Sequence, residues 1–191
     1  MTNATAASRD RAEQGRGYSD LRGRREPRII TGGDGVHVID QDGKSYIEGL
    51  AGLWCSSLGF DEDRLADAAD KQMRRLPYYH GFGNIVTDVT VDLAEKLIGL
   101  APCPMSKVLF TNSGSEANDL AIKLIWYVNN ALGRPRKKKL ISRLKGYHGV
   151  TVASASLTGL PHLHTDFDLP MAGVLPTPSP HHHRLRHDRH P

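Results

Sequence analysis

LFTNSGSEAN, residues 109–118, joins a run of strand-forming residues to the start of an amphipathic helix. Residues 107–111 form a compact β-rich run, which is typical of a strand in a covered sheet. After the turn, apolar side chains recur at helical spacing and predict a helix over residues 115–132. Ser113 and Glu116 stand three residues apart, as in a capping box. The stretch therefore predicts a strand, a polar turn and a long helix.

The turn between strand and helix has the features of an anion-binding site. Gly114 leaves no side chain over the first helical turn, and Ser115 adds a hydroxyl beside the free backbone N–H groups. These donors and the positive end of the helix dipole suit a phosphate. A capping box after a strand is nevertheless common in α/β proteins and needs no ligand. The spacing alone therefore favours a purely structural turn.

Three segments together resemble one enzyme family. Residues 111–118, TNSGSEAN, resemble the phosphate-binding motif of the class III aminotransferases, which use pyridoxal phosphate (PLP). Residues 146–151, GYHGVT, resemble that family's cofactor-stacking motif, and residues 49–55, GLAGLWC, resemble the substrate-side segment of its omega-amino acid–pyruvate transaminase branch. The resemblance covers roughly residues 27–175. It implies an α/β fold, namely an incomplete large domain of a fold type I PLP-dependent transferase with an N-terminal β-hairpin segment.

The resemblance also implies the site residues. Gly114 and Ser115 would bind the cofactor phosphate, and Tyr147 would stack on the pyridine ring. Trp54 would border the substrate pocket, and Phe82 is a second substrate-side candidate, because in related enzymes an aromatic side chain at this point reaches the facing subunit. The relatives are typically homodimeric. The alternatives are that Trp54 is a core anchor and that Tyr147 packs on a sheet edge.

The catalytic lysine of the family has no counterpart here. That lysine forms a Schiff base with PLP, and in the family it lies far downstream, after the aspartate that pairs with the pyridine nitrogen. The last lysine of this chain is Lys145, and Asp166, Asp168 and Asp188 precede the region where the aspartate would fall. The chain is therefore expected to be an inactive, truncated form of a transaminase that moves an amino group from an omega-amino acid or amine to a keto acid such as pyruvate.

Two other functions remain open from the sequence. A non-catalytic interaction protein could use the aromatic loop and the hairpin to dock on an intact paralogue. A small module that binds a phosphate ligand would need only the turn at Gly114 and Ser115. The abrupt change of composition at Pro176, into proline, histidine and arginine, favours a shifted reading frame near that codon as the origin of a truncated chain.

The chain order predicts four segments. Residues 1–26 are expected to be a flexible arm, 27–60 a hairpin and substrate-side segment, 61–175 a partial PLP-binding domain, and 176–191 a disordered tail. The predicted elements within them are strands at 36–39 and 45–47, helices at 61–76 and 87–100, a βαβ unit of strands 107–111 and 139–142 around helix 115–132, a short helix at 150–157 and a strand from 173. The carboxyl ends of the parallel strands would place the turn after residue 111 and the Tyr147 loop at one edge of the sheet.

Composition excludes several other classes. The formal net charge of the 191 residues is +4, but the excess of basic residues lies at the two ends, which argues against a nucleic-acid partner. The basic run at 134–139 follows the long helix, where cations complement the negative end of the dipole. No run is long and apolar enough for a membrane span. Cys55 and Cys103 have no metal-ligand or disulfide spacing, so no metal is expected and a cytoplasmic location is the default.

Overall fold

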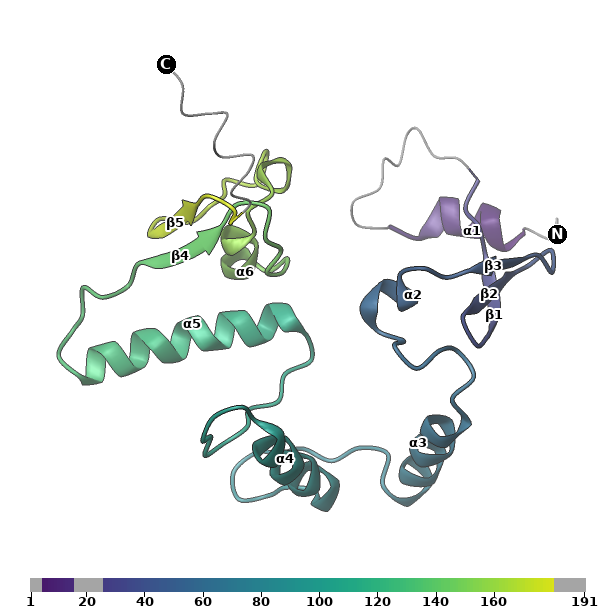
Figure 1. The fold of residues 1–191 in the computed structure, drawn as a ribbon, viewed down its shortest axis with the longest axis horizontal. Coiled ribbons are helices and arrows are strands. Elements are labelled where there is room, and N and C mark those ends of the chain that lie inside the picture. Colours follow the sequence, from purple (N-terminus) through teal and green to yellow (C-terminus); the bar gives the residue numbers. More distant parts are fainter. Residues whose placement is uncertain (1–4, 16–25, 181–191) are drawn as a thin grey trace. The chain divides into compact units, whose positions relative to one another are not determined.

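The computed structural model describes residues 5–15 and 26–180 of the chain. The chain divides into two compact units, Met1–Thr87 and Asp88–Pro191, and each is described by itself (Figure 1).

A three-stranded antiparallel sheet is the centre of the first unit. Its strands are β1 (Ile30–Asp34), β2 (His37–Asp40) and β3 (Ser45–Ile47), in the order β1-β2-β3. The predicted hairpin of β2 and β3 is confirmed, whereas β1 was not predicted because its two glycines break the alternation of apolar residues. One of them, Gly33, is required, since an added Cβ would lie 2.5 Å from the Phe60 Cβ.

A buried aspartate organises the turn of this hairpin. Asp40 Oδ1 accepts hydrogen bonds from the backbone N–H groups of Asp42 (3.1 Å) and Lys44 (2.9 Å), and its Oδ2 accepts one from the Tyr46 hydroxyl (2.8 Å). The bond from Tyr46 is the main reason that the pKa of the Asp40 carboxyl lies below its ordinary value. The turn is thus held by groups that lie within six residues of each other.

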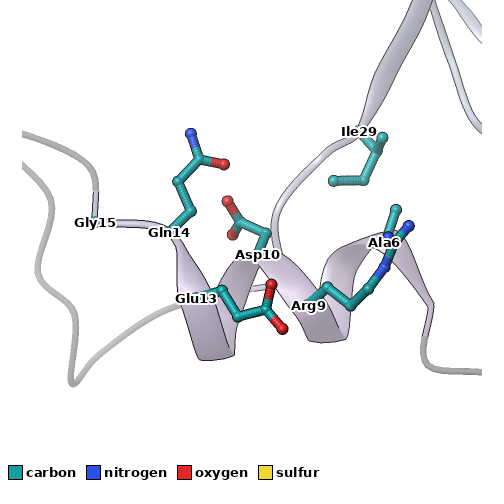
Figure 2. A pocket seen from close by; sticks show the side chains of 7 residues that line it. All are labelled: Ala6, Arg9, Asp10, Glu13, Gln14, Gly15 and Ile29. Carbon is teal, nitrogen blue, oxygen red and sulfur yellow. The ribbon is translucent and has the colours of Figure 1, made fainter.

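The N-terminal segment contains a helix where a flexible arm was expected. Helix α1 spans Ala6–Glu13, and the Thr5 side chain caps it by accepting a hydrogen bond from the Ser8 N–H (3.2 Å). The segment lacks hydrophobic periodicity, and the helix is favoured instead by its cap and by its alanine, arginine and glutamate residues. Figure 2 shows a pocket beside α1 that reaches Ile29 and contains none of the predicted site residues.

Four helices in the described residues agree with their sequence signals. Helix α3 spans Asp63–Arg75, α4 spans Asp88–Leu100 and α5 spans Gly114–Ala131, so their predicted ends are correct to within two residues. The short helix α6, Val152–Leu157, is confirmed as well. The predicted apolar face of α4 is exposed in this chain; its members are Leu93, Leu97 and Leu100.

The predicted βαβ unit around α5 is wrong. Residues 107–111 form no strand, because a strand requires a hydrogen-bonded neighbour and no described segment pairs with them. The parallel pair is instead β4 (Leu140–Arg143) with β5 (Val174–Thr177), in register from Leu140 opposite Val174 to Arg143 opposite Thr177. Helix α6 and a 3-10 turn, η1 (Pro161–Leu163), lie in the connection between these strands. Figure 1 labels α6 there.

Strand β5 continues through Pro176, where the sequence predicted the start of a disordered tail. The Gly173 carbonyl accepts a hydrogen bond from the Leu140 N–H (2.9 Å), and the Thr177 carbonyl accepts one from the Leu144 N–H (2.8 Å). Alternate residues of a strand point their backbone groups to opposite sides, so the nitrogen of Pro176 faces away from β4 and no ladder bond is lost. The histidine-rich residues 181–191 lie outside the described residues.

The basic run after α5 stabilises the end of that helix, as predicted. Lys138 Nζ donates to the Trp126 carbonyl (2.9 Å) and to Asn130 Oδ1 (2.7 Å), while Trp126 Nε1 donates back to the Lys138 carbonyl (3.2 Å). A cation therefore lies near the negative end of the helix dipole.

Candidate functional site

The N-terminus of α5 presents free hydrogen-bond donors. Ser113 caps the helix by accepting from the Glu116 N–H (3.2 Å), as predicted. The second half of the predicted capping box is different, since the Glu116 carboxylate accepts from the backbone (2.9 Å) and the side chain (3.2 Å) of Asn112. The N–H groups of Gly114 and Ser115 donate to no residue in the described part of the chain. A Cβ on Gly114 would meet nothing within 4 Å, so the space above the first turn is open.

The loop of residues 146–151, between β4 and α6, is fixed by a buried threonine. Thr158, at 1% exposure, accepts at Oγ1 from the His148 N–H (2.9 Å) and donates from the same hydroxyl to the Gly149 carbonyl (3.2 Å). The Gly146 carbonyl accepts from the Gly159 N–H (2.8 Å). The backbone is thus held on both sides of Tyr147, whose side chain is 58% exposed.

This loop and the start of α5 lie together, although more than thirty residues separate them in the chain. The Val150 N–H donates to Ser115 Oγ (3.0 Å), and Asn118 Nδ2 donates to the His148 carbonyl (2.6 Å). The predicted juxtaposition of the turn with the Tyr147 loop is therefore confirmed. The two segments are not held by a strand at residues 107–111, as predicted, because those residues form no strand. Hydrogen bonds of α5 side chains to the loop hold them together instead.

Asp119 extends the same junction to the start of α6. Its Oδ1 accepts hydrogen bonds from the Thr151 hydroxyl (2.9 Å) and from the Ser154 N–H (3.0 Å). Ser154 is fully buried, and its Oγ in turn accepts from the Thr151 N–H (3.1 Å). We use the name α5–α6 junction for Ser115, Asn118 and Asp119 together with residues 148–154.

A glycine allows this close approach. Gly149 has a φ of 132°, and a Cβ there would lie 2.4 Å from Ser154 Oγ and 2.6 Å from Ser115 Oγ. Any side chain would push α5 and α6 apart. Sequence reasoning missed this role and those of Asn118, Asp119 and Ser154, because their partners lie 30–35 residues away. No local pattern identifies such pairs.

The donors at the start of α5 fit the phosphate of a cofactor such as PLP. The Ser115 oxygen accepts from the Val150 N–H, while its own proton has no acceptor among the described residues. Two backbone N–H groups and one hydroxyl can therefore donate to an anion at the positive end of an 18-residue helix. The open space above Gly114 admits such a group.

The substrate-side candidates belong to the first unit. Trp54 ends helix α2, Ala51–Trp54, which is a left-handed turn with φ between 48° and 66°. The side chains of Trp54 and Phe82 are 74% and 83% exposed, so Trp54 is no core anchor in this chain. Left-handed backbone costs roughly 1–2 kcal/mol per residue other than glycine. In the described residues, no three histidine, cysteine, aspartate or glutamate side chains form a group that could hold a metal ion.

Comparison with known proteins identifies relatives along most of the chain. The class-III aminotransferase family model matches residues 18–190. The chain is 56% identical to gamma aminobutyrate transaminase 1, mitochondrial, of Solanum lycopersicum over 160 residues, which are 83% of this chain and 31% of that protein. It is 54% identical to vanillin aminotransferase of Capsicum annuum over 157 residues, which are 82% of this chain and 34% of that protein.

Solved structures agree with these matches. The omega transaminase of Pseudomonas jessenii in complex with PMP superposes with a TM-score of 0.92 at 53% identity, covering 94% of this chain and 40% of that one. A tryptophan-to-glycine variant of a thermostable form, engineered for asymmetric synthesis of bulky amines, has the same score and identity. The chain thus spans about a third of the curated relatives and two fifths of the solved ones.

The family accounts for the fold described above. The solved relatives are PLP-dependent transaminases of fold type I, and PLP is the cofactor of this family. None of the helices in residues 5–15 and 26–180 has the length and apolar character needed to span a bilayer. The family match over residues 18–190 shows that the chain belongs to the class-III aminotransferases.

Proposed function

We propose that this chain provides the phosphate-binding and ring-facing residues of a transaminase that moves an amino group from an omega-amino acid or amine to a keto acid such as pyruvate. The observation that carries the proposal is the hydrogen bond from the Val150 N–H to Ser115 Oγ (3.0 Å). It joins the two motifs that a PLP enzyme uses for the phosphate and for the ring.

Each cofactor-side residue has a defined task. The N–H groups of Gly114 and Ser115 and the Ser115 hydroxyl donate to the phosphate, and the α5 dipole favours its negative charge. Tyr147 faces the ring, and its backbone neighbours are held by Thr158 and Asn118. The bound PLP supplies the electron sink and carries the amino group between substrates.

The substrate-side residues are Trp54 and Phe82. Both are exposed aromatic side chains, and Trp54 stands on a left-handed turn of the kind that concentrates at functional sites. The names of the relatives support an omega-amino acid or amine as the donor. We also propose a homodimer, in which Phe82 would contribute to the site of the facing subunit.

Cysteine chemistry and charge distribution bear on the location and the partners. Cys55 and Cys103 are free and exposed, which supports a reducing compartment such as the cytoplasm. The names of two plant relatives contain the words mitochondrial and chloroplastic, so the compartment stays a prediction. The charge distribution supports neither a nucleic-acid nor a membrane partner.

Ligand binding by the 191-residue chain tests the proposal. The probe is pyridoxamine phosphate, because its amine does not react with surface lysines as the PLP aldehyde would. Replacing Ser115 by alanine removes one donor to a charged acceptor, worth roughly 1.5–3 kcal/mol, and should weaken binding at least about tenfold. Gly114→Val should weaken binding further, since its side chain would fill the phosphate space.

Fluorescence titration measures these affinities, and circular dichroism checks that each variant folds. Ser106→Ala is the matched control, because Ser106 is exposed and makes no hydrogen bond with the described residues. Equal affinities for the wild type, Ser115→Ala and Gly114→Val would show that the phosphate does not bind at this helix.

A further inference from the structure

Asp119, on α5, binds both the loop before α6 and the first turn of α6 through its Oδ1 atom. It lies on α5, six residues after the Ser113 cap, and accepts from Thr151 and from Ser154 at the start of α6. Thr151 also contacts Ser154 through their hydroxyl oxygens at 2.6 Å. Because Ser154 is fully buried, water cannot replace the bond that its N–H makes to Asp119.

Asp119 bonds the residue that follows Val150, and Val150 is the donor to Ser115. Thr151 directly follows Val150, and the Val150 N–H donates to Ser115 Oγ (3.0 Å). Holding the Thr151 side chain therefore holds the neighbouring peptide against the first turn of α5. Asn118 acts on the other side of the loop, through the carbonyl of His148, and so lies next to Tyr147.

The Val150 bond determines how Ser115 can act. A serine hydroxyl has one proton to donate and two lone pairs that accept. A backbone N–H only donates, so the Val150 contact uses a lone pair and leaves the Ser115 proton for another acceptor. No described residue accepts that proton. The junction thus presents Ser115 as a donor at the open end of α5.

We propose that Asp119 is a positioning residue for the cofactor phosphate, which keeps the Ser115 hydroxyl as a donor by holding Thr151 and Val150 against α5. The inference rests on the proposed function, because the phosphate of the cofactor is the acceptor. It assigns different tasks to two neighbours on one helix. Asp119 acts on the phosphate side, and Asn118 acts on the ring side.

The test compares pyridoxamine phosphate with pyridoxamine, which lacks the phosphate. The ratio of their affinities isolates the phosphate interaction, and a general loss of folding does not change it. Asp119→Ala should lower this ratio about tenfold, because the Ser115 donor is no longer oriented. Asp119→Asn keeps an acceptor oxygen and should retain most of the ratio. Asn118→Ala should weaken both ligands by similar factors.

Two controls separate positioning from general stability. Asp92→Ala removes an exposed acidic side chain from α4 and should leave the ratio unchanged. The double variant Ser115→Ala with Asp119→Ala should show no lower ratio than Ser115→Ala alone, because both changes remove the same donor. Asp119→Ala could lose its helical circular dichroism signal, in which case Thr151→Val takes its place in the test. Thr151→Val removes one of the two hydrogen bonds to Asp119, so it should lower the affinity ratio by a smaller factor.

The possible outcomes are distinct. A wild type that binds both ligands equally would contradict the proposed function. A wild type that prefers pyridoxamine phosphate, with the same preference in the Asp119→Ala and Thr151→Val variants, would overturn only the role of Asp119. A lower affinity ratio in Asp119→Ala, together with a ratio near that of the wild type in Asp119→Asn, supports the role of Asp119.

Discussion

Two aspartates organise two regions of this chain, and they differ in how far their partners lie along the sequence. Asp40 accepts three hydrogen bonds from groups two to six residues away and shapes the hairpin of β2 and β3. Asp119 accepts two bonds from groups 32 and 35 residues away and joins α5 to α6. The hairpin turn is thus a local structure, while the junction exists only when distant segments have folded together.

This difference has an energetic consequence. Closing a loop of about 32 residues costs roughly 1.5 kcal/mol more chain entropy than closing one of six. Buried hydrogen bonds in the junction must offset that cost. Its side chains, such as the fully buried Ser154, are too closely packed to move when a neighbour is changed. The junction is therefore the more sensitive region, and it also contains Ser115, which we propose binds the cofactor phosphate.

The largest expected effect concerns turnover. The 191-residue chain alone should show no transamination. The junction contains no lysine, and the last lysine of the chain, Lys145, precedes the position at which the family's catalytic lysine is expected. Alanine formation from pyruvate, an amine donor and PLP measures it, against a control with free PLP. Turnover clearly above that control would mean that one of the chain's own lysines, up to Lys145, reacts with the cofactor.

Paired glycine substitutions compare the regions directly. Gly149→Ala should cost roughly 2–6 kcal/mol of unfolding free energy and abolish binding of pyridoxamine phosphate, because the new Cβ meets Ser154 and Ser115 at a φ of 132°. Gly43 in the hairpin turn has a φ of 78° with nothing within 4 Å. Gly43→Ala should therefore cost only about 1–2 kcal/mol from backbone strain.

Denaturant unfolding and ligand titration of both variants measure this contrast. Equal losses of stability, or ligand binding retained by Gly149→Ala, would remove the distinction between a local turn and a long-range junction.

The smallest effect is a pH dependence of the hairpin. The Tyr46 hydroxyl lowers the pKa of Asp40 in the folded chain, so the charged carboxylate stabilises the turn. That contribution is complete above the pKa of an unfolded aspartate, near 4, and is lost as the pH falls through the lowered folded value. Tyr46→Phe should move the loss to a higher pH, as followed by the NMR shifts of the Asp42 and Lys44 amides. An unchanged midpoint would contradict the role of Tyr46.

Sequence patterns predicted the parts of the molecule whose causes are local. The ends of α3, α4 and α5 follow from caps and amphipathic periodicity, and the hairpin follows from its turn residues. The strand at residues 107–111 was wrong because β-structure depends on a neighbour that the local sequence does not contain. Helix α1 was missed because it has a cap but no apolar face.

The candidate site shows the same division. The Ser113 cap and the start of α5 were predictable from residue types at short spacing. The family and the expected cofactor roles of Gly114, Ser115 and Tyr147 came instead from the resemblance of three motifs, at residues 49–55, 111–118 and 146–151, and these roles stay predictions. The roles of Asn118, Asp119 and Gly149 emerged from the folded chain, because a hydrogen bond or a close contact across thirty residues has no signature in either segment alone. Local patterns thus predicted the turn and its helix, and packing determined which side chains hold the segments in place.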